Sequence, residues 1–232
     1  MNIIWLGHGS FRIEIEDQVV LVDPWFTGNP MLPEAQHAAA IGGATHILVT
    51  HGHFDHIADV VKISKDTGAP VSGMYELAQY LHSIGAVEGA AFNMGGTIAL
   101  GDAVKASMVP ASHSSTADID GTRRYMGSEA GYILRGEGRT IYISGDTGLM
   151  ADMAWIGDYY KPDIGILSAG GHYTMDMEMA AYAARSYFAF NVVIPCHYRT
   201  FPALAQTAEA LTNGVLPGTS VIEPQVMEAI TL

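Results

Sequence analysis

The stretch Thr50-His51-Gly52-His53-Phe54-Asp55-His56 places three imidazoles and one carboxylate within six residues. It follows a short apolar segment, Ile47–Val49, that is typical of a buried strand, and it precedes a helix expected over Ile57–Thr67. Side chains in a turn between a strand and a helix are not bound to the fixed facing of either element, so these four can converge on one point. Neutral imidazole suits zinc, iron, nickel or copper, and a carboxylate extends the range to manganese. The stretch therefore predicts a metal site.

Three further candidate ligands each come directly after a predicted strand. A lone His or Asp in such a place is more often a structural or turn-forming residue. All three, however, lie at the carboxyl end of a predicted strand, as the stretch above does. Seven candidate ligands exceed the three that hold a catalytic zinc, and they suffice for two ions that share one carboxylate. The three additional residues are His113, Asp146 and His197.

Hydrophobic periodicity predicts a β-rich start, a mixed middle, a second β-rich part and an αβ end. Strands are expected over Ile3–Leu6, Phe11–Ile15, Val19–Val22, Ile47–Val49, Thr97–Leu100, Val104–Val109, Ala130–Leu134, Thr140–Ser144, Ile164–Leu167 and Val192–Pro195. Helices are expected over Ile57–Thr67, Tyr75–Ile84, Met175–Phe188 and Ala203–Ala210. This order excludes a doubly wound parallel sheet, in which strand and helix would alternate throughout, and it fits two stacked sheets with helices outside both. Since nothing marks a seam, one domain over residues 1–232 is expected.

Composition narrows the class of partner and compartment. The net charge of −13, with eleven Lys and Arg in all, argues against nucleic acid, whose phosphates draw affinity from clustered basic residues. Cys196 is the single cysteine, so no intrachain disulfide forms, and the chain begins without a secretory signal. No apolar run approaches the ~20 residues that span a bilayer. We expect a cytoplasmic protein that acts on a small molecule away from membranes; a homo-oligomer remains open.

Several short motifs together resemble a known family. They are Trp5-Leu6-Gly7-His8-Gly9-Ser10, Val22-Asp23-Pro24, Ser168-Ala169-Gly170-Gly171-His172-Tyr173-Thr174-Met175 and Pro195-Cys196-His197-Tyr198. With the His-rich stretch, these motifs make the chain similar to hydrolases of the metallo-β-lactamase superfamily, in the UPF0173-like branch. The similarity extends over nearly the whole chain. Ascorbate-6-phosphate lactonase and N-acyl-phosphatidylethanolamine phospholipase D belong to related branches. The resemblance implies an α+β fold, the four-layer αββα sandwich of that superfamily.

The resemblance also implies how the ligands divide. His51, His53 and His113 would hold a first metal ion, and Asp55, His56 and His197 a second, with Asp146 bridging the two. Asp23 resembles an acid that orients a ligand imidazole, although an Asp before Pro is as often a turn former. The implied cofactor is a pair of divalent cations, zinc foremost, with manganese, iron or nickel also compatible with the donor set.

Other residues are candidates for substrate contacts or proton transfer. His8 and His172 sit beside glycines, and we expect His172 to donate a proton or hydrogen bond in catalysis, with His8 doing the same or packing the floor of the site. Arg123 and Arg124 lie in Ser114–Gly127, which reads as a mobile loop, and either is a candidate to grip a substrate carboxylate or phosphate; a solvated loop is the alternative. Arg199 is a further candidate, close in sequence to His197.

The expected function is hydrolysis of a small ester, lactone or phosphodiester by a hydroxide held between two metal ions, with Asp146 essential to that pair. A nuclease or phosphodiesterase of the same superfamily is the alternative enzyme, and the negative charge counts against a nuclease. A metal-stabilised sensor domain without activity is the remaining alternative.

Overall fold

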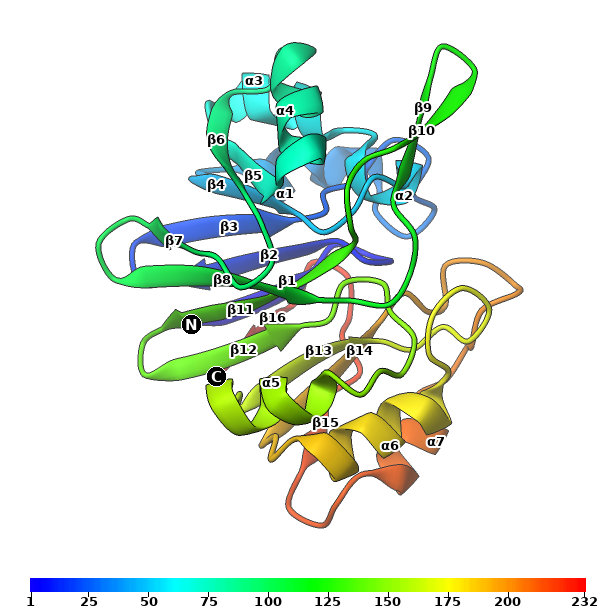
Figure 1. The fold of residues 1–232 in the computed structure, drawn as a ribbon. Helices are drawn as coiled ribbons and strands as arrows, with labels where there is room; N and C mark the ends of the chain where they lie inside the picture. The colour runs from blue at the N-terminus through cyan, green and yellow to red at the C-terminus, as the bar shows by residue number, and fades with distance from the viewer.

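The computed structural model describes residues 1–232 and contains two seven-stranded sheets packed face to face (Figure 1). β2 (Phe11–Ile15) illustrates how the sequence produces this arrangement. Its three apolar residues are fully buried, while Arg12 and Glu14 between them lie on the opposite, partly exposed face. Strands with this alternation bury one face against the other sheet and leave the second face for helices or solvent.

The first sheet is antiparallel at one side and parallel at the other. The pairs β16–β1, β1–β2 and β2–β3 are antiparallel, and β3, β4, β5 and β6 run parallel. In spatial order its strands are β16 (Ala229–Thr231), β1 (Asn2–Trp5), β2, β3 (Gln18–Val22), β4 (His46–Val49), β5 (Val71–Met74) and β6 (Glu88–Phe92).

The second sheet has the same mixed character. β7, β8, β11 and β12 pair antiparallel, and β12, β13, β14 and β15 run parallel. In spatial order its strands are β15 (Ser220–Val221), β14 (Val192–Cys196), β13 (Ile164–Ser168), β12 (Arg139–Ile143), β11 (Ala130–Gly136), β8 (Val104–Pro110) and β7 (Thr97–Leu100).

Helices cover the outer faces of both sheets. Figure 1 places α3 (Val60–Thr67) and α4 (Tyr75–Ser83) outside the first sheet, and α5 (Met153–Tyr160), α6 (Met177–Tyr187) and α7 (Glu209–Gly214) outside the second. Shorter elements, the 3-10 turn Glu34–Gln36, α1 (His37–Ile41) and α2 (Phe54–Ile57), complete the first layer. The four-layer αββα architecture predicted from the sequence is confirmed. None of the helices has the length and apolar character needed to cross a bilayer.

Two predicted helices differ from the structure for identifiable reasons. The helix expected over Ile57–Thr67 is interrupted at Asp59, whose carboxylate accepts hydrogen bonds from Phe26 N, Thr27 N and Thr27 Oγ1. The helix expected over Ala203–Ala210 is wrong, because that segment is held by long-range backbone bonds instead. Ala205 N donates to Gly170 O, and helix α7 begins only at Glu209.

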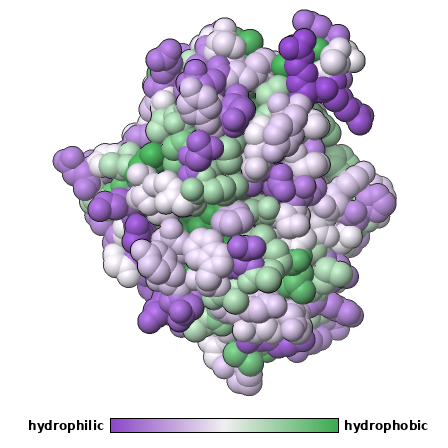
Figure 2. Space-filling view, in the orientation of Figure 1, coloured by the Kyte–Doolittle hydropathy of each residue, from purple (hydrophilic) through white to green (hydrophobic).

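The segment Ser114–Gly127, expected to be a mobile loop, contains a two-stranded hairpin. β9 (Thr116–Ile119) and β10 (Thr122–Tyr125) pair only with each other and join neither large sheet. Their turn places Asp120 and Gly121 at φ 52° and 77°, and the Asp118 carboxylate accepts from Gly121 N. Left-handed conformations at both central residues suit the twist of a tight hairpin. The hairpin projects from the body in Figure 1, and Figure 2 shows that its tip is mostly hydrophilic.

A single cluster of buried apolar side chains fills the space between the sheets. Tyr132 on β11 adds a polar link across it, because its hydroxyl donates to Val49 O on β4 at 2.6 Å. Tyr142 on β12 is equally buried, but its hydroxyl has no hydrogen-bond partner.

Replacing Tyr132 by Phe is therefore expected to lower the free energy of unfolding by about 1 kcal/mol, since a buried hydrogen bond is lost. Tyr142→Phe is the matched control and should cost nothing, because the removed hydroxyl is desolvated without compensation. Urea unfolding of both variants and the wild type measures the difference. Equal destabilisation by the two substitutions would contradict the assigned role of the Tyr132 bond.

Candidate metal centre

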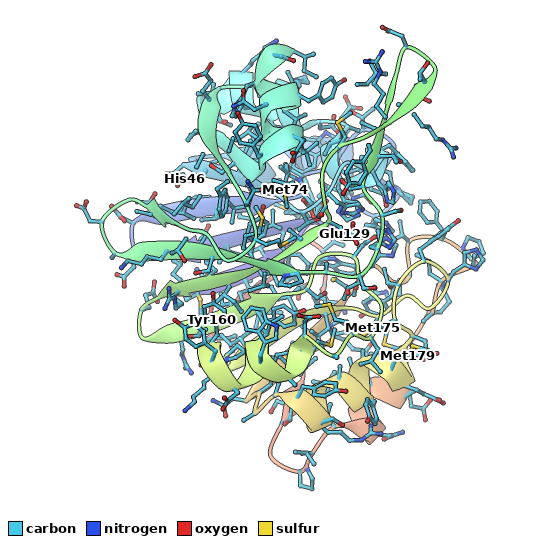
Figure 3. The ribbon with its side chains drawn as sticks, viewed as in Figure 1. His46, Met74, Glu129, Tyr160, Met175 and Met179 are labelled. Carbon is cyan, nitrogen blue, oxygen red and sulfur yellow. The ribbon has the colours of Figure 1, made fainter.

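All seven candidate ligands lie beyond the carboxyl ends of strands, at one edge of the two sheets. The turn after β4 carries His51 and His53, and α2 then presents Asp55 and His56 from its first turn. The other three follow β8, β12 and β14, which run in the same direction within the second sheet. Glu129 lies near this edge, because its carboxylate accepts from His113 N. In Figure 3, His46, at the other end of β4, lies on the opposite side of the molecule from Glu129. The residues after β8, β12 and β14 are His113, Asp146 and His197.

Three imidazoles form one group of facing nitrogens. His53 Nδ1 lies 2.9 Å from His51 Nε2 and 3.2 Å from His113 Nε2. Imidazole nitrogens that face one another at this range need a shared proton or a cation between them, because two lone pairs repel. This is the group that the sequence resemblance assigned to a first metal ion.

A second group gathers around Asp55, His56 and His197. Asp55 Oδ2 lies 3.6 Å from His56 Nε2 and 3.6 Å from His197 Nε2. Asp146 Oδ2 lies between the two groups: it is 3.0 Å from His197 Nε2 and 3.4 Å from His56 Nε2, and 3.8 Å from His113 Nε2 and 4.0 Å from His51 Nε2. One carboxylate oxygen thus faces imidazoles of both groups.

These spacings fit a pair of metal ions. Two ligand atoms that are each ~2.0–2.1 Å from a tetrahedral zinc lie roughly 3.3–3.4 Å apart. The distances around Asp146 Oδ2 span this value, and His56 Nε2 is buried with no hydrogen-bond partner. A buried nitrogen that faces two carboxylates and makes no hydrogen bond has the environment of a metal ligand.

Asp23 supports both groups from behind. Its Oδ2 accepts from His56 Nδ1 at 2.8 Å and from Thr50 Oγ1 at 2.5 Å, and Thr50 Oγ1 lies 2.9 Å from His51 Nδ1. A carboxylate that accepts a hydrogen bond from one ring nitrogen fixes the hydrogen on that nitrogen and leaves the other nitrogen free to bind a metal. Asp23 is fixed in turn, since its Oδ1 accepts from Thr50 N. The orienting role stays a prediction, and these hydrogen bonds are the ones that it requires.

Comparisons with known proteins show the family to which the chain belongs. The β-lactamase superfamily domain matches residues 18–198. UPF0173 metal-dependent hydrolases of Roseobacter denitrificans and Ruegeria pomeroyi are 63% and 61% identical to the chain over 230 residues, which is 99% of this chain and 99% of each relative. The chain belongs to the UPF0173 family of metal-dependent hydrolases. The resemblance inferred from the sequence motifs is confirmed.

A solved structure extends the similarity to the fold. Igni18, a metallo hydrolase from the hyperthermophilic archaeon Ignicoccus hospitalis, is 30% identical to this UPF0173 protein, with a TM-score of 0.84. The match covers 99% of this chain and 97% of Igni18, so the two share their architecture from end to end.

Burial and mutual charge set opposite protonation states within the centre. Burial lowers the pKa of His51 well below its usual range, and the neighbouring His56 lowers it further. For His197, burial acts in the same direction, but the charge and hydrogen bond of Asp146 outweigh it and raise the pKa to about 9. His56 follows His197, because Asp146, Asp55 and Asp23 together outweigh its burial and raise its pKa. Burial opposes ionisation of Asp146, but His197 and His56 hold its pKa well below the usual value.

A cavity of about 710 Å³ opens over the centre in this UPF0173 protein. One wall is aromatic, formed by Phe54 and Phe201, with Trp25 behind them at ring-centroid distances of 5.7 and 6.3 Å. Another part of the lining comes from the β9–β10 hairpin and the loop that leads into it, and it is polar; its residues are Ser114, Thr116, Asp118 and Arg123. This volume suits a small molecule.

The remaining substrate and proton-transfer candidates divide by position. Arg123 and His8 line the cavity, and no ion pair or hydrogen bond occupies the Arg123 guanidinium. Arg124 is its exposed neighbour on the hairpin and does not line the cavity. The Arg199 guanidinium lies over the rings of Trp5 and Tyr198, at 5.6 and 5.5 Å, so cation–π packing rather than the cavity surrounds it.

His172 is exposed in the loop between β13 and α6, and its ring lies 4.5 Å from that of Tyr173. Tyr173, not His172, lines the cavity. The proton-donor role expected of His172 stays a prediction, and nothing in this geometry supports it. Sequence reasoning missed the aromatic wall, although Phe54 lies inside the His-rich stretch and Phe201 follows His197 by four residues.

Metal binding to stripped protein at pH 7 is expected to release protons. His197 has a pKa of about 9, so it is protonated at pH 7, and a cation must displace its proton in order to bind. The apparent affinity should therefore fall as pH falls, by up to about tenfold per pH unit for each displaced proton. Titration calorimetry in two buffers with different heats of ionisation measures the release. A binding heat independent of the buffer would contradict the assigned protonation.

Proposed function

We propose that this protein hydrolyses a small ester, lactone or phosphodiester with the help of two divalent cations, zinc foremost. The observation that carries the proposal is the position of Asp146 Oδ2, which faces imidazoles of both groups at 3.0–4.0 Å on the floor of an open cavity. Two such cations, when bound, lower the pKa of a water to near neutrality and polarise the substrate oxygen.

The residues of the chain supply position and environment. His51, His53 and His113 would hold one cation, and Asp55, His56 and His197 the other, with Asp146 shared. Asp23 and Thr50 fix the orientation of two of these rings through the hydrogen bonds described above. Both residues are buried, so this side of the site is shielded from solvent, while the cavity opens on the other residues of the centre.

The cavity walls define how a substrate would lie. The aromatic wall of Phe54 and Phe201 offers apolar contact for an acyl or aryl group. The polar wall offers hydroxyl groups and the guanidinium of Arg123, which suits a carboxylate or phosphate. An open cavity also favours catalysis over a sensor role, because structural metal sites are closed by four protein ligands.

Asp146→Ala is expected to reduce the metal content from about two ions per chain to about one or fewer and to abolish nearly all turnover, since both ions lose a shared ligand. Elemental analysis gives the stoichiometry, and hydrolysis of bis-p-nitrophenyl phosphate and of simple lactones gives the activity, with metal-stripped protein as the blank. Asp102→Asn, at an exposed turn far from the cavity, controls for loss of one negative charge.

Full activity of Asp146→Ala with a single ion would refute the two-metal proposal. Activity toward the lactones but not the phosphodiester would select attack on a carbonyl carbon, and the reverse would select phosphorus. No activity on either class, with two ions bound, would favour the non-catalytic binding function.

A further inference from the structure

His8 occupies a constrained position beneath the second group of candidate ligands. It lies in the turn between β1 and β2 with φ 53°, a left-handed conformation that is uncommon outside glycine. Its carbonyl oxygen accepts from Trp5 Nε1 at 2.8 Å and from His197 N at 2.9 Å. The backbone that carries the ring is therefore fixed by two buried hydrogen bonds, one of them from a candidate ligand residue.

The His8 ring connects a threonine to a candidate ligand. Its Nε2 lies 2.9 Å from Asp55 Oδ2, and its Nδ1 lies 2.8 Å from Thr200 Oγ1. An ionised carboxylate only accepts, so Nε2 carries the hydrogen. In the neutral ring Nδ1 is then an acceptor for the Thr200 hydroxyl, whose other acceptors, Tyr198 O and Met31 Sδ, are farther away at 3.2 and 3.3 Å. The hydrogen bonds thus run from Thr200 through His8 to Asp55.

The surroundings prevent the ring from turning away from Asp55. His8 is fully buried, its ring centroid lies 3.8 Å from that of His197, and Trp25 and Phe201 lie edge-on at 5.3 and 5.6 Å. Asp55, in contrast, is partly exposed in the first turn of a helix of four residues. Its carboxylate has no other donor within hydrogen-bond distance among the side chains, because His56 and His197 are both at 3.6 Å.

From this arrangement we infer that Thr200 and His8 are positioning residues that hold the Asp55 carboxylate toward His56 and His197 as a ligand of the second cation. The inference rests on the proposed two-metal centre. It assigns the hydrogen bonds from Thr200 through His8 to Asp55 to the second cation of that centre. A ring nitrogen that donates to Asp55 has no lone pair left for a metal, so His8 acts through Asp55 rather than as a ligand. Asp23 has the equivalent role behind His56 and, through Thr50, His51.

The test compares Thr200→Val, which removes the hydroxyl at nearly constant volume, with Thr200→Ser, which keeps it. Stripped proteins are titrated with Co²⁺ against a chromophoric chelator, and the visible absorption spectrum is recorded at one and two equivalents. Thr200→Val should weaken binding of the second ion by about 10–100-fold and change its absorption bands, leaving the first ion unaffected. Thr200→Ser should restore both affinity and spectrum to near wild type.

Two further measurements keep the inference testable if Thr200→Val folds poorly. His8→Asn tolerates the left-handed backbone but is too short to reach Asp55, so it should show the same selective loss of the second ion. Nitrogen NMR of the zinc-bound wild type should find His8 Nε2 protonated. A proton-free Nε2 could not donate to Asp55 and would overturn the inference.

The outcomes separate this inference from the proposed function. If the wild type binds two ions and Thr200→Val matches it in both affinities and spectrum, the positioning role is wrong and the two-metal centre stands. If the wild type itself binds one ion or none, the two-metal centre fails and the positioning role fails with it. Equal weakening of both ions by Thr200→Val would also overturn the inference, because a general loss of packing would then explain the effect.

Discussion

The cost of burying carboxylates underlies the arrangement of this protein. Asp23 and Asp146 are almost fully buried at the edge of the two sheets, where an isolated negative charge is strongly disfavoured. The chain places imidazoles, and no Lys or Arg, against both of them, and imidazoles can be neutral or charged as the local balance requires. A centre built in this way accepts cations readily, because cations provide the positive charge that the buried carboxylates lack.

The same constraint explains why the centre lies at a sheet edge. Strand interiors satisfy their own backbone groups and leave no room for converging polar side chains, while the loops beyond strand ends can turn several side chains toward one point. Loops after β4, β8, β12 and β14 meet at that edge, and the Tyr132–Val49 hydrogen bond ties the two sheets together just behind it. The rigid sheets thus set the distance between ligand groups that come from different layers.

Much of this could be predicted from the sequence, for a physical reason. Each candidate ligand lies within a few residues of the end of an apolar strand, so the local sequence pattern and the local geometry agree. Prediction failed where long-range contacts decide the structure. Val71–Met74 and Glu88–Phe92 are strands without clear alternation, paired by the parallel sheet around them. Ala203–Ala210 has helical composition, yet bonds to Gly170 and Arg199 hold its first residues in turns.

The residues of the candidate site also differ in whether local sequence or long-range contacts determine their surroundings. Thr200 and Asp55 are brought together by His8, which is 192 residues from one and 47 from the other, and no local pattern reveals such a chain. Arg199 is the converse case: nearness in sequence to His197 predicts a substrate contact, and this stays a prediction, while the guanidinium itself lies over the rings of Trp5 and Tyr198.

The β9–β10 hairpin has a consequence for how the cavity of this protein can be altered. Its strands pair only with each other, and its outer residues add little to the buried cluster between the sheets. Ser115, at its base, holds the ligand turn, since its Oγ accepts from Gly52 N, whereas Asp118–Arg123 at its outer end have no such bond to that turn. Changes at the outer end therefore alter one wall of the cavity with little effect on the folding of the sandwich. The protein therefore separates the floor of the cavity, built on the two large sheets, from a wall that folds on its own pairing, so that substitutions in this wall can reshape the cavity with little penalty in stability.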